Sequence, residues 1–224
     1  FGDNMKKKIV VIGAGPAGAY CGKDLAEKGI KVLVVDKEKF PRHKTCGGLI
    51  SSKALKLIQD DCFDNYLNNI KSNPVNKIIL TCGQKETELE KNQVLGMVVR
   101  RKDFDDALIN MAMDKGADFV DRCEYKYHRD LKNSYEIHTT RGIFYSDYLI
   151  GADGVFSNVA QVSKLRQRFL KWEMGLAVSC EIPKELVIEK NGAEFIFFKV
   201  LGGMGWCFSG KDLVNIGVGG YALD

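Results

Sequence analysis

The glycine-rich turn at residues 13–18 constrains the fold of this chain more than any other feature of its sequence. The residues before it, Ile9–Ile12, form an unbroken β-branched run, which is typical of a parallel strand buried on both faces. The turn reads Gly13-Ala14-Gly15-Pro16-Ala17-Gly18 and matches the pattern G-x-G-x-x-G. In this pattern the first glycine allows a tight turn, the second lets the backbone approach a pyrophosphate, and the third lets helix and strand pack closely.

The residues after the turn complete a dinucleotide-binding unit. Pro16 suits the first turn of a helix, and Gly29 is a natural C-terminal stop. A second apolar run at 30–35 ends in Asp36, roughly 20 residues past the glycines, where a carboxylate accepts hydrogen bonds from a ribose diol and repels a 2′-phosphate. This continuation disfavours the alternative, a signal peptide with Lys6–Lys8 as its charged region. The unit alone does not separate NAD from FAD.

Composition and charge limit the classes of function. Lys and Arg number 33 against 29 Asp and Glu, and they are scattered, so nothing argues for a nucleic-acid partner. The seven cysteines include no Cys-x-x-Cys pair, and the three histidines lack metal-ligand spacing, so neither a disulfide framework nor a metal site is predicted. A reducing, cytoplasmic location is the default. No apolar run approaches the ~20 residues that span a bilayer.

Two further segments select the cofactor. The run 148–151 ends in Gly-Ala-Asp-Gly with Asp153 and Gly154, and it resembles the Asp-Gly fingerprint of p-hydroxybenzoate hydroxylase-like flavoproteins. Arg101, three residues before Phe104, resembles the arginine of an Arg-x-x-Phe-Asp element in the same superfamily. The resemblance implies that FAD is the cofactor, that Arg101 reaches it, and that the segment around Tyr125 touches its adenine through backbone atoms. The alternatives are a surface Asp-Gly turn and solvated arginines.

The stretch 40–48 is the most distinctive of the chain. It is a loop with three basic side chains and the thiol of Cys46, and it could place positive charge and backbone N–H groups against a pyrophosphate. It closely resembles the Pro-Arg-x-Lys-x-Cys-Gly-Gly signature of geranylgeranyl reductases and their archaeal lipid-reducing relatives. The resemblance implies that Cys46, Gly47 and Leu49 border the flavin and the substrate. The alternatives are an unreactive, packed thiol at Cys46 and solvated side chains at Arg42 and Lys44.

A pair of segments near the end of the chain indicates the substrate. Residues 203–209 and 214–219 resemble the family's Tyr-x-Trp-x-Phe-Pro and Asn-Val-Gly-Val-Gly strands, whose aromatic side chains line a cavity for a lipid chain. Met204 replaces the usual tyrosine and Ser209 the usual proline. The resemblance implies that Trp206 and Phe208 line a pocket for an apolar substrate; the alternative is that both are plain core residues.

These patterns predict an α/β protein with a Rossmann-type FAD-binding domain (GR2 type, p-hydroxybenzoate hydroxylase-like) and a second, partly antiparallel sheet for the substrate. The expected FAD domain is discontinuous, at 1–74 and 97–165, with the substrate sheet at 75–96 and 166–224. Between Tyr125 and Tyr148, period-two alternation predicts a three-stranded meander. The candidate strands of the second sheet are 78–80, 94–99, 177–182, 194–200 and 205–208.

By resemblance, the reaction is the reduction of C=C bonds in a polyprenyl chain by reduced FAD, with Cys46 as the one protein proton donor that the sequence offers. The electron donor stays open, and an apolar substrate allows peripheral contact with a membrane. The alternatives are an FAD-dependent aromatic monooxygenase or halogenase, and a non-catalytic or electron-transfer flavin module. The sequence lacks the family's Gly-Asp-Ala-Ala-Gly flavin segment, so we expect either a fragment or a short form that holds FAD weakly. The predicted cofactor-binding residues are Gly13, Gly15, Pro16, Ala17, Gly18, Asp36, Lys37, Arg42, Cys46, Gly47, Leu49, Arg101, Tyr125, Asp153 and Gly154.

Overall fold

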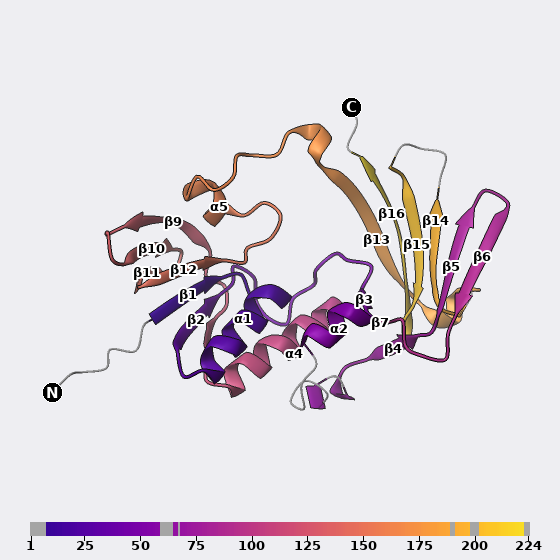
Figure 1. The fold of residues 1–224 in the computed structure, drawn as a ribbon, viewed down its shortest axis with the longest axis horizontal. Helices are drawn as coiled ribbons and strands as arrows, with labels where there is room; N and C mark the ends of the chain where they lie inside the picture. Colours follow the sequence, from indigo (N-terminus) through magenta and orange to yellow (C-terminus); the bar gives the residue numbers. More distant parts are fainter. Residues whose placement is uncertain (1–7, 59–64, 67, 189–190, 198–201, 222–224) are drawn as a thin grey trace. The chain divides into compact units, whose positions relative to one another are not determined.

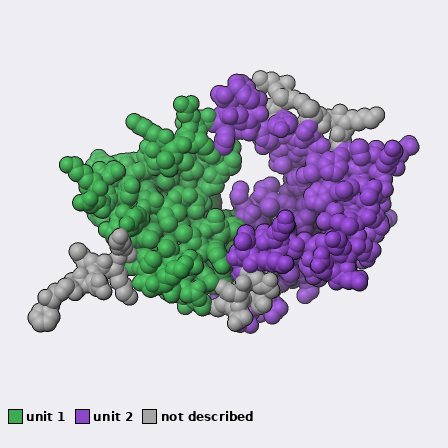
Figure 2. Space-filling view, viewed as in Figure 1, with its two compact units in different colours: residues 1–42, 105–168 green, residues 43–104, 169–224 purple. Residues whose placement is uncertain are grey.

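The computed structural model contains two compact units, each assembled from two stretches of the chain (Figures 1 and 2). Unit 1 comprises residues 1–42 and 105–168, and unit 2 comprises residues 43–104 and 169–224. The predicted α/β class with further antiparallel sheets is confirmed. The assignment of a flavin role and a substrate role to separate parts of the chain stays a prediction. The structure describes residues 8–58, 65–66, 68–188, 191–197 and 202–221.

Unit 1 is built on a four-stranded parallel sheet (Figure 1). Its strands, in spatial order, are β12 (Tyr148–Gly151), β1 (Lys8–Ile12), β2 (Lys31–Val35) and β8 (Asp118–Val120). Strand β1 pairs on both sides, and its last four residues are buried, as the β-branched run predicted. Residues 9–12 therefore form a central strand of the sheet.

Helix α1 begins and ends where the sequence predicted. Helix α1 starts at Pro16, and Gly29 follows its end with a φ of +73°. Leu108 and Met111 of α4 are fully buried, and Gly116 follows that helix with a φ of +98°. The helices of unit 1 are α1 (Pro16–Glu27), α4 (Arg101–Asp114), of which the residues from Asp105 onward belong to unit 1, and α5 (Asn158–Val162).

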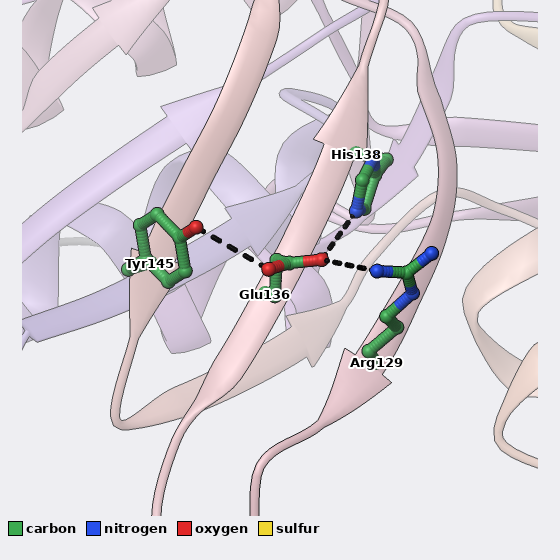
Figure 3. Close-up of polar contacts among 4 residues, drawn as sticks. All are labelled: Arg129, Glu136, His138 and Tyr145. Atoms are coloured by element: carbon green, nitrogen blue, oxygen red, sulfur yellow. Dashed lines mark hydrogen bonds and ion pairs between the residues drawn. The ribbon is translucent and has the colours of Figure 1, made fainter.

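The predicted meander forms a second sheet in unit 1, with the strands in the order β11 (Gly142–Ser146), β10 (Tyr135–Thr139) and β9 (Tyr125–Asp130). Ile137 of the central strand is fully buried in the core cluster of this unit. Side chains of the neighbouring residues form a polar cluster in which the Glu136 carboxylate accepts hydrogen bonds from Arg129 and Tyr145 and is joined to His138 (Figure 3). His138 therefore takes part in a half-buried polar cluster on the strand surface.

Unit 2 contains a six-stranded sheet that is antiparallel except where β14 pairs with β5. The predicted strands at 78–80, 177–182 and 205–208 all belong to it, and the last part of the predicted strand 194–200 lies outside the described residues. In spatial order the strands are β13 (Gly175–Pro183), β16 (Leu213–Tyr221), β15 (Met204–Ser209), β14 (Ala193–Phe197), β5 (Lys77–Cys82) and β6 (Lys85–Glu90).

The predicted strand at 94–99 was assigned to the wrong sheet. Strand β7 (Gly96–Val99) pairs with β3 (Leu49–Ser51) and β4 (Ser72–Val75) in a separate three-stranded sheet. Its Val98 still packs into the core cluster of the unit, so the apolar pattern revealed burial but not the strand's partners. The remaining elements of unit 2 are α2 (Ser52–Ile58) and the short 3₁₀ turns η1 (Lys171–Glu173) and η2 (Lys184–Leu186).

The described residues contain neither a membrane-crossing helix nor a metal-binding cluster. No helix among them is long and apolar enough to cross a membrane. Within the same residues, no group of three or more His, Cys, Asp or Glu side chains has the geometry to hold a metal ion.

The two isoleucines at the second turn of the meander provide a matched test of its packing. Ile137 is fully buried, whereas Ile143 on the next strand is 50% exposed. We expect Ile137→Ala to lower the free energy of unfolding by about 2–5 kcal/mol, because it opens a cavity in the core. Ile143→Ala should change it by less than about 1 kcal/mol. Urea denaturation measures both, and equal losses would contradict the described packing.

Candidate functional site

The three glycines of the turn have different structural roles. Gly13 has a φ of +101°, and a Cβ there would lie 2.4 Å from the carbonyl oxygen of Ala152. A Cβ on Gly18 would lie 1.8 Å from the carbonyl oxygen of Gly13, so both positions require glycine. Gly15 has more space: among the described residues, an added Cβ there would meet only the Nη2 atom of Arg42, at 3.6 Å. The turn is therefore accessible at the glycine where a pyrophosphate would approach the backbone.

The N-terminus of α1 is suited to an anion. Gly15 is its N-cap and provides no side-chain hydrogen bond, and the first turn contains no acidic residue. Pro16 has no N–H, so the free N–H groups of this end begin with Ala17. These N–H groups and the helix dipole favour negative charge.

Asp36 lies directly after β2 and is 8% exposed. Its Oδ2 accepts a hydrogen bond from the N–H of Ala14 at 2.7 Å, and its Oδ1 accepts one from the N–H of Glu38 at 2.9 Å. A carboxylate offers about four acceptor positions, so both oxygens can still accept a hydroxyl group. Asp36 therefore fits its predicted role with a ribose. The neighbouring Lys37 is exposed, and its predicted contact with the cofactor stays a prediction.

Arg42 brings a cation to the open side of the turn. Its Nη1 lies 2.9 Å from Oδ2 of Asp105, and the two side chains are 10% and 0% exposed. Its guanidinium also lies over the Phe40 ring, 4.9 Å from the ring centre. Within the described residues, the buried Nη1 is an ion-pair partner but makes no hydrogen bond of good geometry. The Nη2 atom, which lies near Gly15, is the one placed to donate to a pyrophosphate oxygen, and this contact stays a prediction.

Asp105 is a residue that the sequence analysis did not identify as part of the site. The signal that could have found it is its place in the Arg-x-x-Phe-Asp pattern, directly after the buried Phe104. The arginine of that pattern, Arg101, belongs to unit 2, and its contact with the flavin stays a prediction.

The Asp-Gly turn lies against the glycine turn. The N–H of Ala152 donates to the carbonyl oxygen of Ile12 at 2.7 Å, which continues the pairing of β12 with β1. Asp153 accepts hydrogen bonds from the Ser157 hydroxyl, at 2.5 Å, and from the N–H of Asn158, at 2.7 Å. These contacts show that Asp153 shapes the turn and the start of α5. Its own contact with the cofactor, and that of Gly154, stay predictions.

Tyr125 is 4% exposed and lies in the core cluster of unit 1. Its hydroxyl lies 2.7 Å from Nδ1 of His128. Burial raises the pKa of Tyr125 to about 12, and the negative charge of Asp153 adds to this rise. Burial also lowers the pKa of His128, so near neutral pH the phenol donates to an uncharged imidazole. The predicted backbone contact of Tyr125 with adenine stays a prediction.

The Cys46 loop of unit 2 is packed against the aromatic strand β15. A Cβ on Gly47 would lie 2.8 Å from the Phe208 ring and 3.0 Å from Nε1 of Trp206. Leu49 packs on the core cluster that contains both aromatic side chains. The structure therefore brings together the two segments that the sequence associated with the substrate.

The side chains of this region differ in exposure. Cys46 is exposed, and its Sγ accepts a hydrogen bond from the N–H of Gly48 at 3.5 Å. Trp206 and Phe208 are only 9% and 5% exposed, so most of their surface belongs to the core. Their predicted contact with a substrate stays a prediction. Asn215, which bonds to this loop, was not among the predicted site residues.

Comparison with known proteins agrees with the unit 1 geometry. Residues 6–180 match the family described as the FAD binding domain. An uncharacterized protein of Methanosarcina barkeri is 33% identical over 96% of this chain and 54% of its own length. Digeranylgeranylglycerophospholipid reductase 3 of Methanosphaera stadtmanae is 25% identical over 96% of this chain and 57% of its own length. The chain thus spans about half the length of the curated relatives it matches.

Solved structures confirm the fold. A geranylgeranyl bacteriochlorophyll reductase-like protein from Thermoplasma acidophilum superposes with a TM-score of 0.80 at 20% identity, over 96% of this chain and 56% of that protein. The halogenase PltM, solved with phloroglucinol and FAD, gives 0.78 at 15% identity, over 96% of this chain and 52% of that protein. At these identities the likeness shows the fold alone. The family match confirms the predicted cofactor, FAD.

Replacing Arg42 by lysine tests its role in binding the cofactor. A lysine keeps the positive charge beside Asp105 but loses the second arm of the guanidinium. We expect Arg42→Lys to raise the dissociation constant of FAD about tenfold, the effect of losing one charge-assisted hydrogen bond. Titration of the apoprotein by flavin fluorescence measures it. Lys44→Ala, at an exposed position nearby in sequence, should change the dissociation constant of FAD by less than about twofold. Equal dissociation constants for the wild type and both variants would refute the role of Arg42.

The half-buried His128 predicts a pH dependence of the free energy of unfolding. Because burial lowers its pKa in the folded state, the unfolded chain binds a proton more readily below pH 6.5. The free energy of unfolding therefore falls as the pH falls below 6.5, by a modest amount because solvent screens a half-buried group. We expect His128→Gln to lose less stability than the wild type between pH 7.5 and 5.5 in urea denaturation. His43→Gln, at an exposed position, should follow the wild type; a His128 variant that does so too would contradict the prediction.

Proposed function

This chain belongs to the FAD binding domain family, and from that premise we propose that it acts in an FAD-dependent oxidoreductase that reduces the C=C double bonds of a polyprenyl lipid chain. The observation that carries the proposal is the Cys46 loop packed against Trp206 and Phe208. This arrangement combines an exposed thiol with a cluster of apolar side chains. Relatives named digeranylgeranylglycerophospholipid reductase, from Methanosphaera stadtmanae and Methanocaldococcus jannaschii, support the substrate class.

The residues of unit 1 would hold the cofactor. Asp36 would accept hydrogen bonds from the ribose, and the N-terminus of α1 would face the pyrophosphate. Arg42, oriented by Asp105, would donate to a pyrophosphate oxygen. When bound, FAD supplies the hydride transfer that the protein's own side chains cannot perform. The protein's contribution to this half of the site is therefore binding and orientation.

The residues of unit 2 would act on the substrate. Reduction of an isolated double bond adds one hydride and one proton, so the second carbon needs a donor. Cys46 is exposed and carries a proton that it can give up, and water can restore it afterwards. Leu49 and the exposed edges of Trp206 and Phe208 would contact the apolar chain and exclude water from it.

An aromatic monooxygenase or halogenase is the alternative enzyme, because such proteins share this fold. A non-catalytic flavin module is the alternative from another class. Neither alternative requires an exposed cysteine next to a glycine that packs against Trp206 and Phe208. This loop is the reason that we favour the reductase.

Purified protein reconstituted with FAD tests the proposal. We expect a yellow protein that, after anaerobic reduction with dithionite, saturates a geranylgeranyl lipid but leaves phenol unchanged. Cys46→Ser should lower the rate at least about tenfold, as expected for the loss of a proton donor. Cys82→Ser, which removes another exposed thiol of the same unit, should not. Product mass spectrometry measures the reaction. A colourless protein, or a yellow one that hydroxylates or halogenates phenol in air, would overturn the proposal.

A further inference from the structure

One amide group joins the Cys46 loop to the aromatic strand of unit 2. The side chain of Asn215, in β16, donates from Nδ2 to the carbonyl oxygen of Cys46 at 2.9 Å. Its Oδ1 accepts a hydrogen bond from Nε1 of Trp206 at 2.9 Å. We propose that Asn215 is the positioning residue that fixes the Cys46 loop and couples its position to Trp206. This inference rests on the proposed function only where it treats Cys46 as the reacting thiol.

The chemistry of the two partners explains why an amide stands here. The indole of Trp206 can only donate, and the carbonyl of Cys46 can only accept. A bridging side chain must therefore accept at one atom and donate at the neighbouring one, as the amide of Asn215 does. The residue is 7% exposed, so neither bond is readily replaced by water. The orientation of the amide is set by its partners.

The exposed part of the loop, residues 43–46, has few contacts besides this anchor. Residues 43–46 are all exposed, so burial does not fix them. Within the described part of the chain, residues 43–47 make two hydrogen bonds, the one from Asn215 and the one between Gly48 and the Cys46 sulfur. The second of these is internal to the loop. The bond from Asn215, which lies 169 residues further along the chain, therefore ties the Cys46 backbone to the sheet at a point between the exposed residues 43–45 and the Gly48 carbonyl, which accepts from the N–H of Val99 at 3.0 Å.

Glycines make the close approach possible. A Cβ on Gly48 would lie 2.3 Å from the carbonyl oxygen of Val99, and one on Gly217 would lie 2.1 Å from the Trp206 ring. Together with Gly47, these residues let the loop and the indole reach the same side chain. The Cys-Gly-Gly and Asn-x-Gly patterns are thus two halves of one contact.

The substitution Asn215→Asp tests the proposal with almost no change of shape. The carboxylate still accepts from Trp206 but presents a second acceptor to the Cys46 carbonyl. We expect amide hydrogen exchange in residues 44–50 to be at least about fivefold faster than in the wild type, the effect of losing one buried hydrogen bond. Asn73→Asp is the matched control, because Asn73 donates to the carbonyl of Ser209 in the same unit. It should leave the exchange of this segment within about twofold.

Acid should rescue the Asn215→Asp variant, since a protonated carboxyl can again donate to the Cys46 carbonyl. The protection of residues 44–50 from exchange, relative to the Asn73→Asp control, should therefore recover as the pH falls. Asn215→Leu should show no such recovery, because leucine has no group that can donate. If Asn215→Asp does not fold, Trp206→Phe provides the second variant, because it keeps an aromatic ring and removes the N–H that orients the amide. Equal protection of residues 44–50 in every folded variant would overturn the proposal.

The exchange measurement needs neither FAD nor substrate, so it separates this inference from the proposed function. Faster exchange in a protein without reductase activity would support the anchor and refute the reductase. In an active protein, Asn215→Asp should lower kcat about as much as Cys46→Ser lowers it, with the dissociation constant of FAD unchanged within about twofold. An unchanged kcat would overturn the positioning role.

Discussion

The close backbone contact between the glycine turn and the Asp-Gly turn is the constraint on which the cofactor half of the structure depends. The N–H of Gly13 donates to the carbonyl oxygen of Val35 at 2.7 Å, and that of Ala152 donates to Ile12 at 2.7 Å. Three strands thereby end at one edge of the parallel sheet with their backbones in contact. No side chain fits between them, because a Cβ on Gly13 or Gly18 would overlap a carbonyl oxygen. The edge thus offers N–H groups to a ligand without a side chain in the way.

Two buried carboxylates, Asp36 and Asp105, lie in the same unit as this edge. Asp36 and Asp105 are nearly inaccessible, and a buried carboxylate is costly unless it is paired or hydrogen-bonded. Asp36 meets that demand with backbone N–H groups, whereas Asp105 meets it with Arg42. A buried ion pair is weak evidence for stability, since its desolvation offsets most of the attraction. Its benefit here is orientation, because it holds a guanidinium beside the turn where a phosphate charge is expected.

Contacts between residues close in the sequence were predicted well, whereas contacts between distant residues were not. The unit from Ile9 to Asp36 was predicted almost residue by residue, because a strand, a glycine turn and a helix each leave a local pattern. The meander was equally predictable, since its strands are neighbours in the chain. Strand β7 was predicted as a strand but assigned to the wrong sheet, because an apolar run records burial and not the identity of its partners. The pairing of Arg42 with Asp105 leaves no local pattern at all.

Asn215 is a second residue whose partners could not be predicted from the sequence, because they lie far from it in the chain or in another motif. The residue stood inside a motif matched in the sequence, yet its side chain had no evident task while the motif was viewed as a strand alone. Only the fold reveals that the side chain of Asn215 bonds to both Cys46 and Trp206, which belong to two different motifs. The residue types of the motifs match this contact. Glycines stand where the backbone and the indole ring approach, and an amide stands between a donor and an acceptor. A sequence motif can therefore reflect a contact between distant segments, and the fold shows which segments those are.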